Sequence, residues 1–213
     1  MGIKTLLYGG AFDMPHIGHA AVALNTLYHM KSRYGFEELW FLPCYSDAFG
    51  QKNIVAGYHR LAMLNHLIEY FGSPLFKVCT DELEMANNTG TYAAICHMIK
   101  TYQGDREFAY LIGTDQANQI FKWRNWQELI ETIPFVVVKR FTTGLELPLT
   151  WYQTKPHVFI DTLYGTKNQI SSTKIREDFA NNWDFWKTEN HKFLRPLVQK
   201  YILDNGLYKN KEV

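Results

Sequence analysis

One stretch decides the fold of this chain: Tyr8-Gly9-Gly10-Ala11-Phe12-Asp13-Met14-Pro15-His16-Ile17-Gly18-His19. The apolar run before the glycine pair predicts a short buried strand, and the glycines allow a tight turn with uncovered backbone N–H groups. Pro15 favours the first turn of a helix, where its missing N–H costs nothing. His16 and His19 lie three residues apart and would share that turn. Because a helix start has free N–H groups and a positive dipole end, the stretch predicts an anion site where imidazoles donate to phosphate.

The composition excludes several classes of protein. At 213 residues the chain can bury a substantial core, and we expect one domain over residues 1–213. A formal net charge of +1 argues against nucleic acid as a partner, since that surface needs a basic excess. The sequence shows no signal-peptide pattern and no apolar run of membrane-spanning length, so we expect a cytoplasmic protein with no membrane partner. Cys44, Cys79 and Cys96 lack paired metal spacing and predict small core residues without bound metal.

Apolar runs alternate with amphipathic stretches along the chain, which predicts an α/β fold. We expect strands at residues 6–8, 38–43, 76–79, 108–113, 135–138 and 157–160. We expect helices at residues 15–24, 59–68, 91–102, 126–130 and 195–205, with another opening at 171–176, and loops at 44–57 and 142–154. The interpretation is a Rossmann-like, doubly wound parallel sheet with a small helical C-terminal cap over about 171–208.

Two stretches carry a family resemblance. Residues 9–19 read Gly-Gly-x-Phe-x-x-Pro-His-x-Gly-His, which is similar to the signature of the His-x-Gly-His nucleotidyltransferase superfamily. Within it, Gly-Gly-x-Phe most resembles the nicotinate-nucleotide (pyridine mononucleotide) adenylyltransferases. Residues 170–176 resemble that family's second signature, Ile-Ser-Ser-Thr-x-Ile-Arg. Taken alone, the second stretch would be interpreted as a capped surface helix.

The resemblance implies roles for individual residues. His16, His19 and Arg176 would be catalytic. The residues implied for ATP binding are Gly9, Gly10, Ala11, Phe12, Gly18, Gly113, Asp115, Ile170, Ser172 and Thr173. Among them, Ser172, Thr173 and Arg176 would hold the β- and γ-phosphates. Asp115, in a stretch similar to the family's Gly-x-Asp, would accept the ribose hydroxyls; without the other motifs it would be interpreted as a helix cap.

The acceptor end is implied by four residues: Lys52, Tyr92, Trp123 and Arg124. Trp123 is similar to the family's tryptophan that stacks on the pyridine ring, and an indole suits a cationic pyridinium. The alternative for Trp123 is core packing, although Trp126 is the better core candidate by its helical spacing. Lys52 would bind phosphate or would be an ordinary solvated lysine. Arg60 is expected to tie its helix to the sheet.

Two places depart from the bacterial pattern. Ala93 follows Tyr92 where the family has threonine, although the family's contact there is partly backbone. After the second expected strand, residues 46–52 replace the usual Pro-Pro-His-Lys and look more like the eukaryotic enzymes that accept both pyridine forms. The choice between nicotinate and nicotinamide is therefore open.

The resemblance implies an adenylyltransferase that moves AMP from ATP to the 5′-phosphate of nicotinate or nicotinamide mononucleotide in NAD biosynthesis. Mg²⁺ is expected on the ATP phosphates with few or no protein ligands. The resemblance leaves the oligomeric state open, including a homo-oligomer. The alternatives are a His-x-Gly-His nucleotidyltransferase with another acceptor, and a nucleotide-binding sensor without catalysis.

Overall fold

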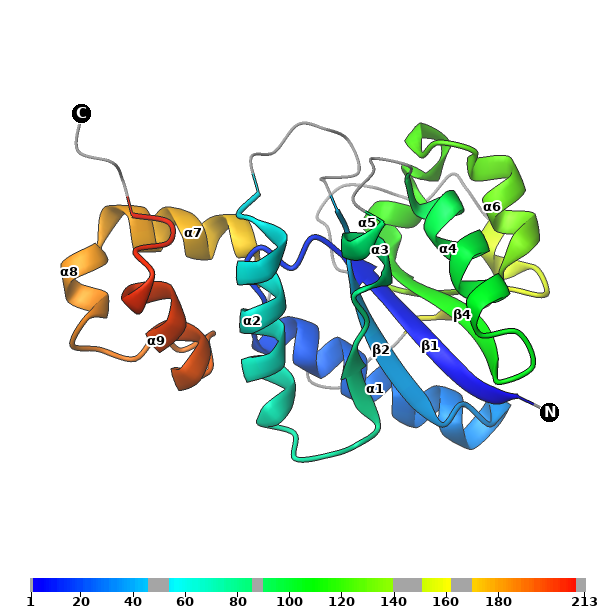
Figure 1. Cartoon of the computed structure of the whole chain (residues 1–213), viewed down its shortest axis with the longest axis horizontal. Helices are drawn as coiled ribbons and strands as arrows, with labels where there is room; N and C mark the ends of the chain where they lie inside the picture. The colour runs from blue at the N-terminus through cyan, green and yellow to red at the C-terminus, as the bar shows by residue number, and fades with distance from the viewer. Residues whose placement is uncertain (1, 46–53, 86–89, 140–150, 162–169, 210–213) are drawn as a thin grey trace.

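A six-stranded, all-parallel sheet forms the centre of the molecule (Figure 1). The computed structural model describes residues 2–45, 54–85, 90–139, 151–161 and 170–209. The strand order is β3-β2-β1-β4-β5-β6, which is the Rossmann order. The strands are β1 (Ile3–Gly10), β2 (Glu38–Pro43), β3 (Phe76–Val78), β4 (Arg106–Gly113), β5 (Phe135–Val138) and β6 (Val158–Ile160). The predicted doubly wound sheet is confirmed.

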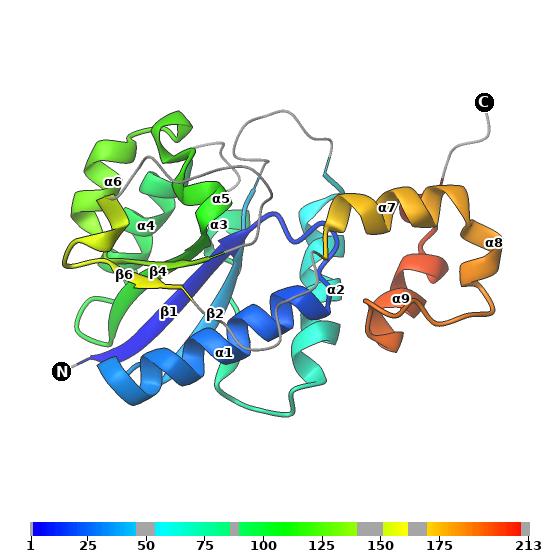
Figure 2. The ribbon, with the colours of Figure 1, turned by 180° about the vertical axis from the view of Figure 1, so that it is seen from behind.

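Helices cover both faces of the sheet (Figures 1 and 2). On one face α1 (Ile17–Tyr34) and α2 (Gly57–Glu69) pack over the strands, and on the other α4 (Gly90–Thr101) and α6 (Trp126–Thr132) do so. Alternate residues of β1 serve the two layers, since Leu6 lies in the core under α1 and Leu7 in the core under α4. Such strands, buried on both faces, read as the continuous apolar runs of the sequence.

The C-terminal segment forms a helical cap beside α2 at one end of the sheet (Figures 1 and 2). Its helices are α7 (Ser172–Asn181), α8 (Trp183–Trp186) and α9 (Pro196–Asp204). A third apolar core joins the cap to the rest of the chain, because Phe179 and Val198 share it with Met63 and with Met14 from the turn after β1. This cap therefore packs directly against the segment that the sequence marks as the site.

Several short elements differ from the expectations. The helices α3 (Asp81–Glu84) and α5 (Thr114–Ala117) and the 3₁₀ turn η1 (Ile120–Lys122) are too short to show a helical period in sequence. The same holds for α8. The 3₁₀ turn η2 (Trp151–Gln153) corrects the end of the expected loop at 142–154, whose first part lies outside the described residues.

Candidate active site

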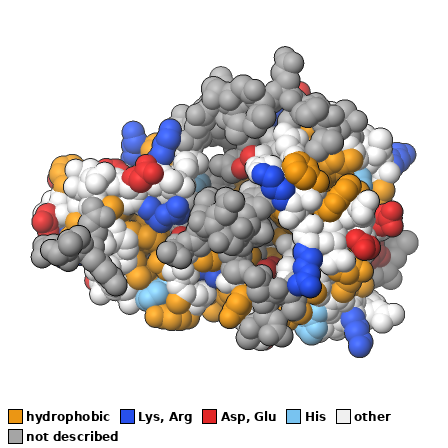
Figure 3. Space-filling view, turned by 90° about the horizontal axis from the view of Figure 1, so that it is seen from above, with side chains coloured by type: hydrophobic (Ala, Val, Ile, Leu, Met, Phe, Trp, Pro, Cys, Tyr) orange, Lys and Arg blue, Asp and Glu red, His pale blue; other side chains and the backbone are white. Residues whose placement is uncertain are grey.

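The candidate site is a cleft of about 350 Å³ at the carboxyl ends of β1 and β4, where the chain order of the strands reverses. Ligands bind at such switch points in open parallel sheets. Figure 3 looks onto the molecule from above and shows acidic and basic side chains interspersed on this face. The polar and glycine residues that line the cleft are Gly9, Gly10, Asp13, His16, His19, Thr91, Gly113, Asp115, Gln116, Ser171, Ser172, Thr173 and Arg176.

The glycine turn after β1 is shaped by the rings around it. A Cβ at Gly9 would lie 1.7 Å from the Tyr110 hydroxyl oxygen, so this position accepts no side chain. Phe12 has a left-handed backbone with φ of 48° and packs its buried ring edge-on against Phe41 and His19, with centroids 5.6 and 5.2 Å apart. Phe12 and Ala11 also line the cleft. The packing of the Phe12 ring against Phe41 and His19 therefore fixes the turn where it lines the cleft.

Two histidines cap α1 reciprocally. His16 is the N-cap residue, and its Nδ1 accepts the Gly18 N–H at 3.1 Å, while Nδ1 of His19 accepts the His16 N–H at 3.2 Å. The helix thus begins at Ile17, and the prediction that Pro15 lies in its first turn is wrong. Because Nδ1 is the acceptor in both rings, the neutral imidazoles carry their hydrogen on Nε2. The planes of the two rings are tilted by 32° to each other, with centroids 3.9 Å apart, and both rings line the cleft.

The backbone of this first turn is not an anion site of its own. The Ile17 N–H donates to the Phe193 carbonyl at 3.0 Å, the Gly18 N–H to His16, and the His19 N–H to the His16 carbonyl at 2.9 Å. The expected free N–H groups are therefore already bonded, and that part of the sequence interpretation is wrong. What the helix start offers to phosphate is the Nε2 side of its imidazoles.

Gly18 acts through the space it leaves. It is absent from the lining of the cleft, and a Cβ there would lie 2.9 Å from Cε1 and Nδ1 of the His16 ring and 3.4 Å from Cβ of Ile170. Contacts below 3.0 Å do not occur for real Cβ atoms unless a neighbour moves. The His-x-Gly-His spacing is thus a steric requirement, because only glycine lets the ring of His16 fold back over the helix start.

The start of α7 faces the histidines from the cap. Its first turn brings Ser172, Thr173 and Arg176 to the cleft. The Ser172 hydroxyl donates to the Met14 carbonyl at 3.0 Å, and Nη2 of Arg176 donates to the Thr173 hydroxyl at 3.2 Å. Nη1 of Arg176 bonds the Asp13 carbonyl and lies 3.6 Å from its carboxylate Oδ2. The second signature therefore docks on the turn that carries the first.

A buried arginine fastens the loops around the cleft. Arg60 on α2 is 1% exposed and donates to three carbonyls: Val55 at 3.0 Å, Ala11 at 2.9 Å and Tyr45 at 3.4 Å. This confirms that Arg60 ties its helix to the sheet. Arg60 thus joins Tyr45 to Val55, which lie on either side of residues 46–53; that segment contains Lys52 and lies outside the described residues.

Glu82 also binds the backbone of Tyr45. Its Oε1 accepts the Tyr45 N–H at 3.3 Å, and the side chain is buried. Burial raises the pKa of Glu82 to about 7, although the Tyr45 N–H and the nearby Arg60 charge oppose that rise. The backbone of Tyr45 is therefore fixed by two side chains: its N–H donates to the Glu82 carboxyl group, and its carbonyl accepts from the Arg60 guanidinium.

The part of the cleft that the sequence predicts to take the acceptor is lined by aromatic side chains. Trp123, Tyr110 and Thr91 line it together with Cys44 and Ile54. Trp123 is 9% exposed and belongs to the core under α4, whereas Trp126 is only partly buried, so the expectation that Trp126 is the better core residue is wrong.

Two of the residues expected at this end lie elsewhere. Tyr92 is not among the lining residues; its side chain lies near those of Cys96 and Thr132, between α4 and α6. The apolar contacts of its ring explain this placement, because they are with the core under α4. Arg124 is exposed and also absent from the lining.

Asp115 and Gly113 also line the cleft, as do Gln116 and Ser171. Asp115 sits in the first turn of α5, directly after β4. Ile170 directly precedes Ser171 in the chain but packs beside Gly18 instead of lining the cleft.

Sequence reasoning missed Asp13, Glu82 and Tyr208 as parts of the site. Asp13 lies inside the quoted signature, and a carboxylate among apolar and glycine residues was a usable signal. Glu82 and Tyr208 carried none, because their contacts to Tyr45 and Asp13 join residues distant in sequence.

Comparison with known proteins assigns the class. The cytidylyltransferase-like family model matches residues 7–178, which include both signatures. The nicotinate-nucleotide adenylyltransferase of Bacillus subtilis (strain 168) is 31% identical over 208 residues, covering 97% of this chain and 99% of the relative. The chain therefore belongs to the cytidylyltransferase-like nucleotidyltransferases and, among them, to the nicotinate-nucleotide adenylyltransferase family.

Solved structures support the fold. The Plasmodium falciparum nicotinic acid mononucleotide adenylyltransferase complexed with NaAD superposes with a TM-score of 0.73 at 22% identity, covering 97% of both chains. The same enzyme complexed with APC gives a TM-score of 0.69 at 20% identity, again covering 97% of both chains. No helix in the described part of this chain is long and apolar enough to cross a membrane.

We expect Gly18→Ala to lower kcat roughly 10-fold or more, because the new methyl displaces the His16 ring from its capping position. Pyrophosphate release at saturating substrates measures kcat. Gly57→Ala is the matched control: its Cβ would also meet an atom at 2.9 Å, but that atom is the end of the flexible Leu83 side chain. Equal turnover of the two variants would contradict the steric role of Gly18.

We expect Glu82 to make stability fall as pH rises. Its pKa of about 7 in the folded protein exceeds its ordinary 4.5, so the folded state keeps a proton that the unfolded chain releases. Stability from this group is full below pH 4.5 and is lost as pH rises through 7. By pH 8 the wild type should lose about 3 kcal/mol relative to Glu82→Gln.

Urea unfolding of both proteins from pH 4.5 to 8 measures this difference. Glu84→Gln, an exposed position on the same helix, controls for the change in net charge. A Glu82→Gln curve parallel to the wild-type curve would refute the shifted carboxyl.

Proposed function

We propose that this chain transfers AMP from MgATP to nicotinate mononucleotide and releases deamido-NAD and pyrophosphate. One observation carries the proposal: the two imidazoles at the start of α1 and the hydroxyls and guanidinium at the start of α7 line one cleft. Phosphates need donors on several sides, and this arrangement supplies them from two directions. The name of the Bacillus subtilis relative supports nicotinate mononucleotide as the acceptor.

The reaction needs positioned donors more than proton transfer. A 5′-phosphate oxygen of the mononucleotide forms a bond to the α-phosphorus of ATP, while the bond from that phosphorus to the bridging oxygen of the β-phosphate breaks. The electron pair of the broken bond leaves with pyrophosphate. Because the attacking phosphate is ionised at neutral pH, no general base is required. Catalysis is then orientation plus stabilisation of developing charge.

The proposed roles follow from the two sides of the cleft. His16 and His19 donate from Nε2 to the transferring phosphoryl group, since Nδ1 of each ring is held by the backbone. Arg176, Ser172 and Thr173 hold the β- and γ-phosphates from α7. The N-cap Ser171 makes no side-chain capping bond, which leaves the first turn of α7 available to the same oxygens.

The nucleoside and pyridine parts take the two remaining walls. Asp115 accepts the ribose hydroxyls. Gly113 has no side chain, so the ribose can approach the backbone there closely. Trp123 presents its indole to the pyridine ring beside Tyr110 and Thr91. We assign no pyridine contact to the side chains of Tyr92 and Arg124, and Lys52 remains a proposed phosphate ligand outside the described residues.

Mg²⁺ enters as part of the MgATP substrate. Within residues 2–45, 54–85, 90–139, 151–161 and 170–209, no group of three or more His, Cys, Asp or Glu is arranged to hold a metal ion. Mg²⁺ keeps several waters and binds phosphate oxygens readily, so the triphosphate itself suffices as its ligand. We place the activity in NAD biosynthesis in the cytoplasm, and propose that the described cleft works within one copy of the chain.

The substrate prediction is measured as pyrophosphate release from MgATP with each mononucleotide supplied separately. We expect nicotinate mononucleotide to give the higher kcat/KM. Higher kcat/KM with nicotinamide mononucleotide would reassign the acceptor. No release with either would leave a nucleotide-binding protein whose acceptor or catalysis differs from this proposal.

His19→Asn should lower turnover roughly 100-fold, because asparagine keeps an acceptor near the position of Nδ1 but has nothing at Nε2. The helix cap should therefore survive while the donor to phosphate is lost. His66→Asn on α2, outside the cleft, is the matched control. Near-normal turnover of a folded His19→Asn protein would remove this residue from the mechanism.

A further inference from the structure

The end of the described chain reaches back to the glycine turn. Tyr208 follows α9, and its hydroxyl donates to Oδ1 of Asp13 at 2.5 Å. The two residues are 195 positions apart in sequence. Burial, and then the nearby Asp13 carboxylate, raise the pKa of Tyr208 well above its usual value, so the hydroxyl remains a donor. Asp13 lines the cleft, whereas Tyr208 lies behind Asp13 and is not a lining residue.

Asp13 is the point where three segments meet. Its Oδ1 also accepts the Val55 N–H at 3.4 Å, and its Oδ2 lies 3.6 Å from Nη1 of Arg176. The same Nη1 bonds the Asp13 carbonyl. With one carboxylate oxygen held by Tyr208, the other is directed at the guanidinium. Asp13 is 4% exposed, so water cannot replace a missing donor easily.

Backbone strain supports a purpose for this contact. Tyr208 has a φ of 66° and Phe12, next to Asp13, has a φ of 48°; both are left-handed conformations that non-glycine residues rarely adopt. Such conformations persist where the surroundings fix them, and they cluster at functional sites. Here Tyr208 is the donor of the contact, and Phe12 directly precedes its acceptor Asp13 in the chain.

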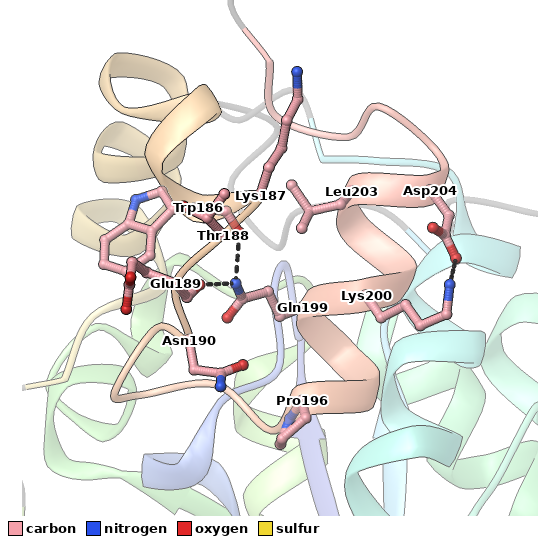
Figure 4. Close-up of a pocket in the computed structure, with 10 residues that line it drawn as sticks. All are labelled: Trp186, Lys187, Thr188, Glu189, Asn190, Pro196, Gln199, Lys200, Leu203 and Asp204. Carbon is pink, nitrogen blue, oxygen red and sulfur yellow. Dashed lines mark hydrogen bonds and ion pairs between the residues drawn. The ribbon is translucent and has the colours of Figure 1, made fainter.

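The cap that carries Tyr208 is itself firmly built (Figure 4). Gln199 on α9 is buried, and its amide donates to the Trp186 carbonyl at 2.8 Å and the Glu189 carbonyl at 2.6 Å. Its Oε1 accepts the His191 N–H at 2.6 Å. Gln199 is one of the residues that line the hollow drawn in Figure 4, and the hydrogen bonds of its amide connect α8 and the loop after it to α9. Tyr208 and the α7 residues beside Arg176 pack on one apolar core with α9, so both side chains belong to the cap that meets the turn at Asp13.

We propose that Tyr208 is a positioning residue for adenylyl transfer: its hydroxyl fixes the Asp13 carboxylate, which in turn aims Arg176 at the phosphates in the cleft. The inference rests on the function proposed above and deepens it. Tyr208 does not touch substrate. It acts through Asp13 on the one guanidinium that the described lining of the cleft contains.

The test begins with Tyr208→Phe, which keeps the ring and removes only the hydroxyl. We expect kcat to fall roughly 5- to 20-fold, the effect of losing a hydrogen bond to a charged group. KM for ATP should change less than about two-fold, since the ground-state contacts on α7 remain. The melting temperature should fall by only a few degrees, because one donor to a buried carboxylate is lost while the packing of the ring remains.

Tyr201→Phe is the matched control. Tyr201 lies on α9, and its hydroxyl bonds Nδ1 of His59 at 3.0 Å, so the substitution removes an equivalent hydroxyl from the same cap without touching Asp13. We expect its kcat to match the wild type. An equal loss in both variants would mean that the cap merely loosens, which would overturn the inference.

A double-mutant cycle with Arg176→Ala separates positioning from general support. If Tyr208 acts through Arg176, removing its hydroxyl should lower kcat no further once the guanidinium is gone. The same fold-loss in both backgrounds, or a fall in melting temperature that accounts for the lost turnover, would overturn the inference.

Failure of the proposed function is distinguishable from failure of this inference. A wild-type protein that turns over, with Tyr208→Phe equal to it, refutes the inference and leaves the function standing. A wild-type protein that releases no pyrophosphate with either mononucleotide refutes the function. That result refutes the positioning role as well, because the role is defined for adenylyl transfer.

Discussion

The reciprocal hydrogen bonds between His16 and His19 are the contact on which the cleft depends. A helix start needs acceptors for its N–H groups, and serine or aspartate usually supplies them. Here two imidazoles supply them through Nδ1, so the helix itself fixes each ring and its tautomer. Nε2 lies on the other side of each ring and is the donor to phosphate in the mechanism we propose. The residues that begin α1 are thus the ones to which we assign the chemistry, and the missing side chain of Gly18 leaves room for the His16 ring.

The buried charges of Arg60 and Asp13 also fix the segments around the glycine turn. Arg60 and Asp13 are nearly inaccessible to solvent, which is unfavourable for an unsatisfied ion. Each is satisfied by partners on separate segments: Arg60 by the carbonyls of Ala11, Tyr45 and Val55, and Asp13 by donors from the cap and from α2's leading loop. Because removing any one partner leaves a buried charge short, the loops are held to one arrangement. Preorganised donors of this kind are what electrostatic catalysis requires.

The sequence predicted the sheet well because its strands are buried on both faces and read as unbroken apolar runs; residues 38–43 and 135–138 match their strands end to end. It predicted which segments meet, since the carboxyl ends of parallel strands share an edge. It could not predict contacts decided by side-chain direction. Tyr92 and Thr91 are neighbours in sequence, yet Thr91 lines the cleft while Tyr92 packs toward α6. Likewise, Trp126 was expected to be the better core residue, but Trp123 is the more buried of the two.

The seam between cap and sheet shows why the long-range contacts matter. Apolar packing of Phe179 and Val198 against Met14 and Met63 holds the two parts together, but such packing is non-directional and fixes orientation poorly. Hydrogen bonds across the seam are directional: Ser172 to the Met14 carbonyl, Arg176 and Tyr208 to Asp13, and Ile17 to the Phe193 carbonyl. Transfer between two bound nucleotides is sensitive to misplacement of about 1 Å. The apolar core therefore holds the cap on the sheet, and the hydrogen bonds across the seam fix the position of the cap relative to His16 and His19.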